Sequence, residues 1–167
     1  MKNAYPELPN VPFQATTVTM PEVIDYLQTL DVPAEAKRAA YIMFRNESGN
    51  GSHGLNNNYV GAQADGARWP AKFDPSIVGT VTKMENQTGK ERIFVAFGSW
   101  RASVDFLVDR VLSRGLFVGG TTHLVTKMAV ADRTALARAY QKEWVSGSAT
   151  AEPNAQALKN FLSMYGQ

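Results

Sequence analysis

A glutamate followed by a long polar stretch is the first place where this sequence could do chemistry. Glu47 stands near the end of a predicted apolar helix, and the segment from Phe44 to Trp69 reads FRNESGNGSHGLNNNYVGAQADGARW. Unpaired carbonyls in the last turn of a helix repel a carboxylate, and apolar neighbours remove water from it. Both effects favour the protonated form, which a general acid working near neutral pH needs. Glu47 is therefore our candidate general acid.

The residues after Glu47 suit a groove that holds a polar ligand. Gly49, Gly51 and Gly54 leave space beside the glutamate, and the asparagines at 56–58 offer hydrogen-bond donors and acceptors. Long polar loops of this kind often carry function. These residues alone leave a second interpretation open, in which the glutamate is an ordinary solvated side chain at a helix end.

Other kinds of catalytic site have little support. The chain has no cysteine, and its two histidines, His53 and His123, lie far apart with no companion carboxylate motif. A metal site needs more ligands than these, and no G-x-S-x-G elbow of a serine hydrolase is present. His53 lies in the polar loop, where it could contact substrate, whereas His123 is most simply structural. We predict that the protein uses neither a metal nor another cofactor.

Length and composition are those of one globular domain. The chain has 167 residues, of which 44% are hydrophobic and 19% charged, and its formal net charge is +2. No block of like charges suggests nucleic acid as a partner. There is no run of about 18 apolar residues that would span a membrane. The N-terminal residues lack the apolar stretch of a signal peptide.

Helix and strand signals place the candidate acid in a mixed α+β fold. Residues 1–17 contain three prolines and are expected to form an irregular lead-in, before a single domain over residues 18–167. Thr19 and Glu22 make a capping-box pattern that opens a short helix, and a buried helix restarts near Pro33 and ends at the candidate acid. The runs SIVGTVTKM and RIFVAF flank ENQTGK and predict a β-hairpin.

Helices dominate the rest of the chain. Ser99 is expected to cap a helix whose apolar positions follow the i, i+3, i+4, i+7 pattern, with Gly115 just after its end. Further helices are predicted around 124–128, from 132 to 144 and from 153 to 165. Mostly helix with one small hairpin is an α+β arrangement.

Two blocks of sequence carry a resemblance to a known family. The first block comprises Glu47, Ser48, Gly49, Gly51, Ser52, Asn58, Tyr59, Gly61, Ala64 and Trp69. The second follows the predicted hairpin and comprises Phe94, Phe97, Ser99, Ser103, Val104 and Asp105. Together they resemble the glucosaminidase-type peptidoglycan hydrolases, glycoside hydrolase family 73 of the lysozyme-like superfamily. The resemblance covers residues 31–117, a little over half of the chain.

The resemblance implies a mostly helical, lysozyme-like domain that cleaves the glycan strands of peptidoglycan beside its hairpin. It implies that Glu47 protonates the glycosidic oxygen between N-acetylglucosamine and the next sugar. The side chains expected to bind substrate are Ser48, Asn58, Tyr59, Gly61, Gln63 and Trp69. Tyr59 and Trp69 would stack on sugar faces. Gln63 stands where the family carries a lysine.

The second catalytic group is a point where this chain departs from the family. Members often carry another acidic residue on the hairpin, and Lys83 stands about where it would be. Glu85 lies two residues further on, and a register shift of two would return its side chain to the same face. Asp65, Asp74 or the substrate's own acetamido group could also assist. Glu85 is our candidate, with a plain turn residue as the alternative.

Three functions stay open at this point. The first is hydrolysis of the N-acetylglucosaminidase type. The second is a lytic transglycosylase, which uses one glutamate and forms an anhydro product. The third is a wall-binding or assembly module that keeps a lysozyme-like groove without turnover.

The expected partner is peptidoglycan, bound by a monomer at the cell wall or in the periplasm. Because no signal peptide is visible, we expect a phage lysin, a virion component or the cargo of a secretion machine.

Overall fold

The described residues include four α-helices, a short 3-10 helix and two two-stranded antiparallel sheets, which confirms the α+β class. The structure is a computed structural model. It describes residues 1–85, 88–113, 134, 137–138, 141–142, 146, 148 and 150–165. Contacts divide the chain into two compact units. The first contains Met1–Tyr26 and Phe44–Phe106, and the second contains Leu27–Met43 and Leu107–Gln167.

Helix α1 (Met20–Thr29) begins at the predicted capping box. The backbone N–H of Thr19 donates to Oε2 of Glu22 over 3.0 Å, and the N–H of Glu22 donates back to Oγ1 of Thr19 over 3.4 Å. Two helix-start donors are thereby satisfied reciprocally. The Thr19 hydroxyl also donates to Oε2 of Glu22 over 2.6 Å. This bond, followed by the one from the Thr19 N–H, lowers the pKa of Glu22.

Helix α2 (Ala34–Glu47) follows Pro33, whose carbonyl accepts hydrogen bonds from the N–H groups of Ala36 and Lys37. The helix is buried on most sides, as predicted. Its side chains with no more than 1% of their surface exposed are Ala36, Ala39, Ala40, Ile42, Met43 and Phe44. A helix buried to this extent has a well-fixed end, and that end carries Glu47.

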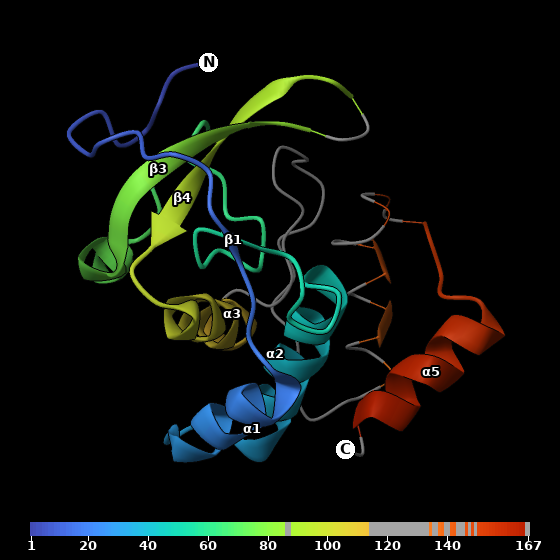
Figure 1. Cartoon of the computed structure of the whole chain (residues 1–167). Helices are drawn as coiled ribbons and strands as arrows, with labels where there is room; N and C mark the ends of the chain where they lie inside the picture. Colours follow the sequence, from blue (N-terminus) through green and yellow to red (C-terminus); the bar gives the residue numbers. More distant parts are fainter. Residues whose placement is uncertain are drawn as a thin grey trace. The chain divides into compact units, whose positions relative to one another are not determined.

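The predicted hairpin consists of β3 (Ile77–Met84) and β4 (Glu91–Phe97), paired antiparallel with an irregularity between Ile77 and Gly79. Both outer edges of the hairpin are covered. Along β3 runs the lead-in segment, where the N–H of Val11 donates to the carbonyl of Thr80 over 2.7 Å (Figure 1). Along β4 lies the end of the polar loop, where the N–H of Ala64 donates to the carbonyl of Ile93 over 2.7 Å.

Three short elements were not predicted. Strand β1 (Ala15–Thr16), which lies within the lead-in, pairs with β2 (Gly54–Leu55) in the polar loop. The 3-10 helix η1 (Ala71–Ser76) precedes β3 and buries Phe73. The β1–β2 pair joins residues that are distant in sequence, so local patterns give no signal for it. The η1 helix is closed locally, by the bond from the N–H of Phe73 to the carbonyl of Pro70.

Helix α3 (Trp100–Ser113) begins at Ser99, as predicted, since Oγ of Ser99 accepts a hydrogen bond from the N–H of Arg101 over 3.1 Å. Helix α5 (Ala155–Tyr165) begins after Asn154, whose Oδ1 accepts from the N–H of Ala157 over 2.8 Å. The predicted helix at 124–128, most of the one at 132–144, Gly115 and His123 lie outside the described residues.

The aromatic core of the first unit centres on Phe106. Trp69 meets the Phe106 ring edge-on with centroids 4.8 Å apart, and Phe73 and Phe97 pack on the same ring at 5.2 and 6.4 Å. Tyr5, from the lead-in, is fully buried, and its hydroxyl accepts a hydrogen bond from the N–H of Trp69. The lead-in is therefore part of the packed structure of this unit.

One half-buried acid, Asp105, lies between α1 and α3. The hydroxyl of Tyr26 donates to Oδ1 of Asp105 over 2.8 Å, and the Tyr26 ring meets that of Trp100 edge-on at 5.6 Å. Burial raises the pKa of Asp105, although the hydrogen bond from Tyr26 opposes the shift. Burial and the neighbouring carboxylate raise the pKa of Tyr26 to about 12. Asp105, matched to the family on sequence, serves here to join two helices.

Candidate active site

Glu47 occupies the last position of α2, and the chain after it closes the helix end. The N–H of Asn50 donates to the carbonyl of Arg45 over 2.9 Å, the long-range bond of a Schellman motif with Gly49 at φ +56°. The hydroxyl of Ser48 donates to the carbonyl of Phe44 over 2.5 Å. The unpaired carbonyls expected near Glu47 are thus partly capped, which corrects the electrostatic expectation made from the sequence.

The side chain of Ser48 belongs to this cap. It is fully buried, and besides its bond to Phe44 it accepts a hydrogen bond from the N–H of Gly51 over 2.8 Å. Ser48 was expected to bind substrate. The structure instead uses its hydroxyl to hold the helix end on which Glu47 stands.

Left-handed backbone explains why the loop is so rich in glycine and asparagine. Gly49, Asn50, Gly51, Asn56 and Asn57 all have positive φ between 47° and 80°, a region that most side chains rarely adopt. At Gly51 a Cβ atom would also lie 2.0 Å from the carbonyl oxygen of Val18. This composition is therefore what the path of the loop requires.

Both polar atoms of the Asn58 side-chain amide form hydrogen bonds, and one of these bonds joins the loop to β4. Its Nδ2 donates to the carbonyls of Ala62 and Val95 over 2.8 and 2.9 Å. Its Oδ1 accepts from the N–H groups of Val60 and Ala62 over 3.3 and 3.1 Å. With 3% of its surface exposed, Asn58 organises the loop from inside.

The neighbouring asparagines are also engaged within the protein. Asn56 exchanges hydrogen bonds with the lead-in, accepting from the N–H of Gln14 and donating to the carbonyl of Pro12. Asn57 donates to the carbonyl of Phe97 over 3.1 Å. The ligand-binding role expected for these amides is replaced by a structural one.

Ser103 ties the two sequence blocks together. Its hydroxyl donates to the carbonyl of Asn57 over 2.6 Å and accepts from the N–H of Tyr59 over 3.1 Å. Ser103 is fully buried at the start of α3. The order and spacing of the blocks therefore have a direct structural meaning in this chain.

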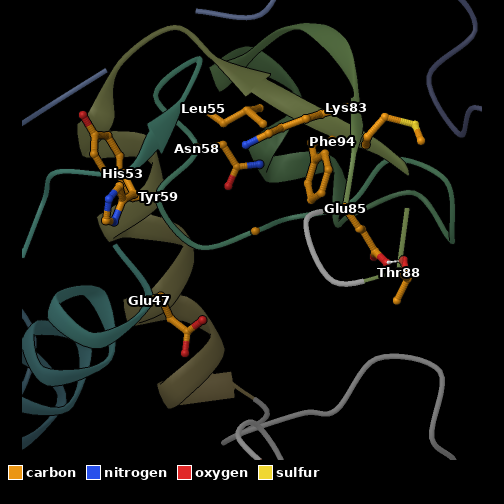
Figure 2. A pocket seen from close by; sticks show the side chains of 11 residues that line it. Glu47, His53, Leu55, Asn58, Tyr59, Lys83, Glu85, Thr88 and Phe94 are labelled. Atoms are coloured by element: carbon orange, nitrogen blue, oxygen red, sulfur yellow. Dashed lines mark hydrogen bonds between the residues drawn. The ribbon is translucent and has the colours of Figure 1, made fainter. Parts of the chain in front are cut away.

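A cleft of about 420 Å³ lies between the polar loop and the hairpin, within the first unit (Figure 2). Glu47 lines it from the end of α2, and Glu85 lines it from the end of β3. Both carboxyl side chains are half-buried. The other lining residues are His53, Leu55, Asn58, Tyr59, Gly61, Lys83, Met84, Thr88 and Phe94.

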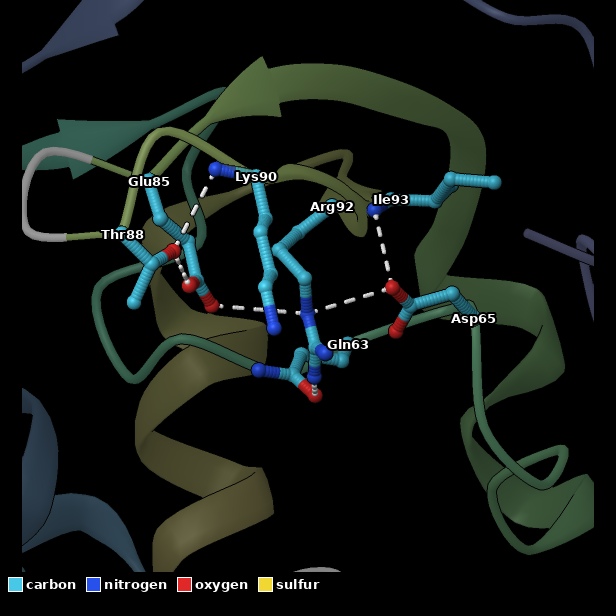
Figure 3. Close-up of polar contacts among 7 residues, drawn as sticks. All are labelled: Gln63, Asp65, Glu85, Thr88, Lys90, Arg92 and Ile93. Carbon is cyan, nitrogen blue, oxygen red and sulfur yellow. Dashed lines mark hydrogen bonds and ion pairs between the residues drawn. The ribbon is translucent and has the colours of Figure 1, made fainter.

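Glu85 is held by an ion-pair network on the hairpin (Figure 3). Nε of Arg92 lies 3.4 Å from Oε1 of Glu85 and 3.2 Å from Oδ2 of Asp65. Another guanidinium nitrogen of Arg92 donates to Oε1 of Gln63. The hydroxyl of Thr88 donates to the second oxygen of Glu85. Glu85 is thus anchored, and the alternative of a plain turn residue understates its contacts.

Several residues predicted to bind substrate do not line the cleft. Gln63 supports Arg92, and its carbonyl accepts a hydrogen bond from the Trp69 indole N–H over 2.8 Å. Trp69 packs against Phe106 in the core. Tyr59 does line the cleft, but its ring is 2% exposed and stacks on Phe44 at 5.2 Å. Stacking of a sugar on either predicted aromatic is therefore not supported.

The other acids considered for the second catalytic role lie elsewhere. Asp65 exposes 3% of its side chain and pairs with Arg92. Asp74 pairs with Arg68 over 3.2 Å. Neither is among the residues that line the cleft. Glu85 is therefore the acidic side chain that the described structure brings to the same cleft as Glu47.

Five cleft residues were missed from the sequence: Leu55, Lys83, Met84, Thr88 and Phe94. Lys83 was noticed only as a departure from the family. His53, which was expected to lie where it could contact substrate, does line the cleft. Alternation along β3 and β4 could have found Phe94 and Lys83, because alternate residues of a strand share a face.

The described part of the chain offers no group of three or more His, Cys, Asp or Glu side chains that could hold a metal ion. None of its helices is long and apolar enough to cross a membrane.

Comparisons with known proteins give one weak likeness. No family model matches the chain, and no curated protein matches it. Among solved structures, it is similar to the crystal structure of a peptidoglycan hydrolase mutant from Sphingomonas sp. A1. That similarity has 18% sequence identity and a TM-score of 0.41, and it covers 89% of each chain.

Proposed function

We propose that this protein cleaves the glycan strands of peptidoglycan, with Glu47 as the general acid. The observation that carries the proposal is that the half-buried carboxyl of Glu47 lines a cleft which also receives Glu85 from the hairpin. Two carboxyl groups beside one groove are the arrangement that most glycoside hydrolases use. The two sequence blocks that resemble the glucosaminidases add to this support.

In the proposed reaction, Glu47 gives its proton to the glycosidic oxygen as the bond from that oxygen to the anomeric carbon breaks. Water then adds its hydroxide to the anomeric carbon, and its remaining proton passes to a carboxylate. Glu85 is the side chain proposed to accept it. The product is a strand with a new reducing end.

A lytic transglycosylase is the second candidate, and the surroundings of Glu85 favour it. Both oxygens of Glu85 contact neighbours, Arg92 and Thr88. If Glu85 takes no part, Glu47 can return as the base and remove a proton from a substrate hydroxyl, which then closes on the anomeric carbon. No water is added, so that product is lighter by one water than the hydrolytic one.

Clearing of purified peptidoglycan tests the role of Glu47. We expect Glu47→Gln to slow clearing by about 100-fold or more, since general acid catalysis contributes roughly 10²–10⁴ in rate. Glu91→Gln is the control, because Glu91 is an exposed glutamate that lies on the hairpin, outside the cleft. Equal clearing by wild type and Glu47→Gln would refute the role of Glu47.

Two further measurements separate the candidate functions. Mass spectrometry of the digest distinguishes a reducing sugar from an anhydro sugar. Glu85→Gln should abolish hydrolysis if Glu85 accepts the proton, and it should leave the anhydro product intact if the transglycosylase route operates. Wild-type protein that sediments with peptidoglycan without clearing it would identify a wall-binding module instead.

A further inference from the structure

The two basic side chains on the cleft side of the hairpin have different surroundings. Arg92 contacts the carboxylates of Asp65 and Glu85. Lys83, which lines the cleft, makes no ion pair with a carboxylate in the part of the chain described. Its Nζ lies instead 5.1 Å from the centroid of the Phe13 ring. The cleft therefore has a cation whose charge the described protein does not neutralise.

Apolar surface adjoins this cation. Phe13, in the lead-in, and Met84, the next residue of β3, each expose 52% of their surface. The pairing of the lead-in with β3 at Val11 and Thr80 keeps Phe13 beside the hairpin. An exposed aromatic ring next to an ammonium group suits a ligand with an apolar sugar face and a negative charge.

The charge of the cleft points to the same ligand. Glu85 is already paired with Arg92, and Glu47 carries a proton when it acts as the proposed general acid. Lys83 adds a compact positive charge with three hydrogen-bond donors, which suits a negatively charged group on the strand. Lys83 also stands where the resembled family has an acid, so this feature belongs to this chain.

We propose that Lys83 is a specificity-determining residue that selects a carboxylated glycan. Its ammonium pairs with a carboxylate attached to the strand, while the Phe13 ring packs against a sugar. In peptidoglycan that carboxylate belongs either to the lactyl ether of N-acetylmuramic acid or to the peptide attached to it. The inference rests on the proposed function, because it names the group of the substrate that the same cleft recognises.

Binding to the Glu47→Gln protein tests the inference without turnover. The probes are peptide-free glycan strands with lactyl carboxylates, the same strands converted to methyl amides, and chitotetraose, which has no carboxylate. We expect the carboxylated strands to bind about fivefold more tightly than the amidated ones, the size of one exposed ion pair. Higher salt should reduce this difference.

Variants of Lys83 test whether this side chain causes the difference in affinity between carboxylated and amidated strands. Lys83→Gln should lose the preference and keep its affinity for chitotetraose, and Lys83→Arg should retain the preference. Lys72→Gln is the matched control, because Lys72 also lies over a phenylalanine, 5.4 Å from the Phe73 ring, but outside the cleft. Strands with intact peptides, whose lactyl groups are amides, distinguish the two sources of carboxylate.

Equal binding of carboxylated and amidated strands would overturn the inference. So would a Lys83→Gln variant that weakens binding of every probe to the same extent, since that indicates a structural role. These results differ from a failure of the proposed function, in which wild type does not clear peptidoglycan and no glycan binds.

Discussion

Replacing Asn58 with alanine should destabilise the protein strongly, although Asn58 is a single neutral side chain. Its amide supplies four hydrogen bonds, to Val60, Ala62 and Val95. The carbonyl of Ala62 keeps a second partner, the N–H of Val95 at 3.0 Å. The N–H groups of Val60 and Ala62 and the carbonyl of Val95 would lose their hydrogen bonds to Asn58.

The expected loss of stability is calculated from these three backbone groups. A buried polar group left without a partner costs about 1–3 kcal/mol. We use the lower end, because water can enter the space that the amide leaves, and expect a loss of about 3 kcal/mol in the free energy of unfolding. For a chain of this length the midpoint of thermal unfolding should fall by roughly 6–12 °C.

Guanidinium unfolding followed by circular dichroism measures this loss. Asn10→Ala is the control, since Asn10 is exposed and its amide makes one hydrogen bond, to the Thr82 hydroxyl over 2.9 Å. That variant should stay within about 0.5 kcal/mol of wild type. If Asn58→Ala also stays within that range, the loop does not depend on this amide and the reasoning is refuted.

Asn58→Asp tests the direction in which stability changes with pH. The aspartate keeps the acceptor for Val60 and Ala62 but turns a carboxylate oxygen toward the carbonyls of Ala62 and Val95. Such a buried charge should have a raised pKa in the folded state. Its stability should therefore be highest at low pH and fall as pH rises through the folded-state pKa. A pH profile parallel to that of wild type would contradict this.

Three further outcomes follow from the described contacts. Burial raises the pKa of Asp105 above its usual 3.8, so the folded state favours the neutral form of this side chain. The free energy of unfolding of Asp105→Asn should therefore rise relative to that of wild type as pH rises from about 3 to 7. A constant difference between the two proteins at all pH values would contradict this. Arg92→Gln removes the cation paired with Asp65, whose side chain is 3% exposed and keeps a hydrogen bond from the N–H of Ile93 over 3.4 Å. This variant should lose about 2 kcal/mol or more in the free energy of unfolding. The double variant with Asp65→Asn should lose less, and an equal loss on denaturation would exclude the ion pair as the cause. Gly51→Ala should lower the melting temperature much more than Gly61→Ala, because both glycines have positive φ but only Gly51 lacks room for a Cβ atom. Equal shifts would show that the backbone moves to relieve the contact between this Cβ atom and the carbonyl oxygen of Val18.

Local signals in the sequence predicted the elements that hold the cleft. The Thr19 and Glu22 capping box, the Ser99 cap and the strand patterns of β3 and β4 each depend on residues near one another in the chain. Glu47 was placed at its helix end for the same reason, since Gly49 follows it as a helix-ending glycine.

Contacts between residues that are distant in sequence could not be predicted. The lead-in was expected to be irregular, yet Val11 pairs with Thr80, and β1 pairs with β2 across the polar loop. Nothing in the spacing of prolines indicates that an extended segment will find the open edge of a hairpin. The same holds for Asp65 and Arg92, whose ion pair joins a loop to a strand.

The internal roles of the motif residues explain why the motif alone cannot distinguish an enzyme from a binding module. Ser48, Asn58 and Ser103 build the loop and join it to α3 through buried hydrogen bonds. Selection for a stable fold would retain them whether or not the cleft performs catalysis. Glu47 and Glu85 are the carboxyl side chains among the residues that line the cleft, so a chemical role is tested at them. The decisive comparison is therefore Glu47→Gln in a protein whose Asn58 network is intact, where lost activity cannot be attributed to a lost loop.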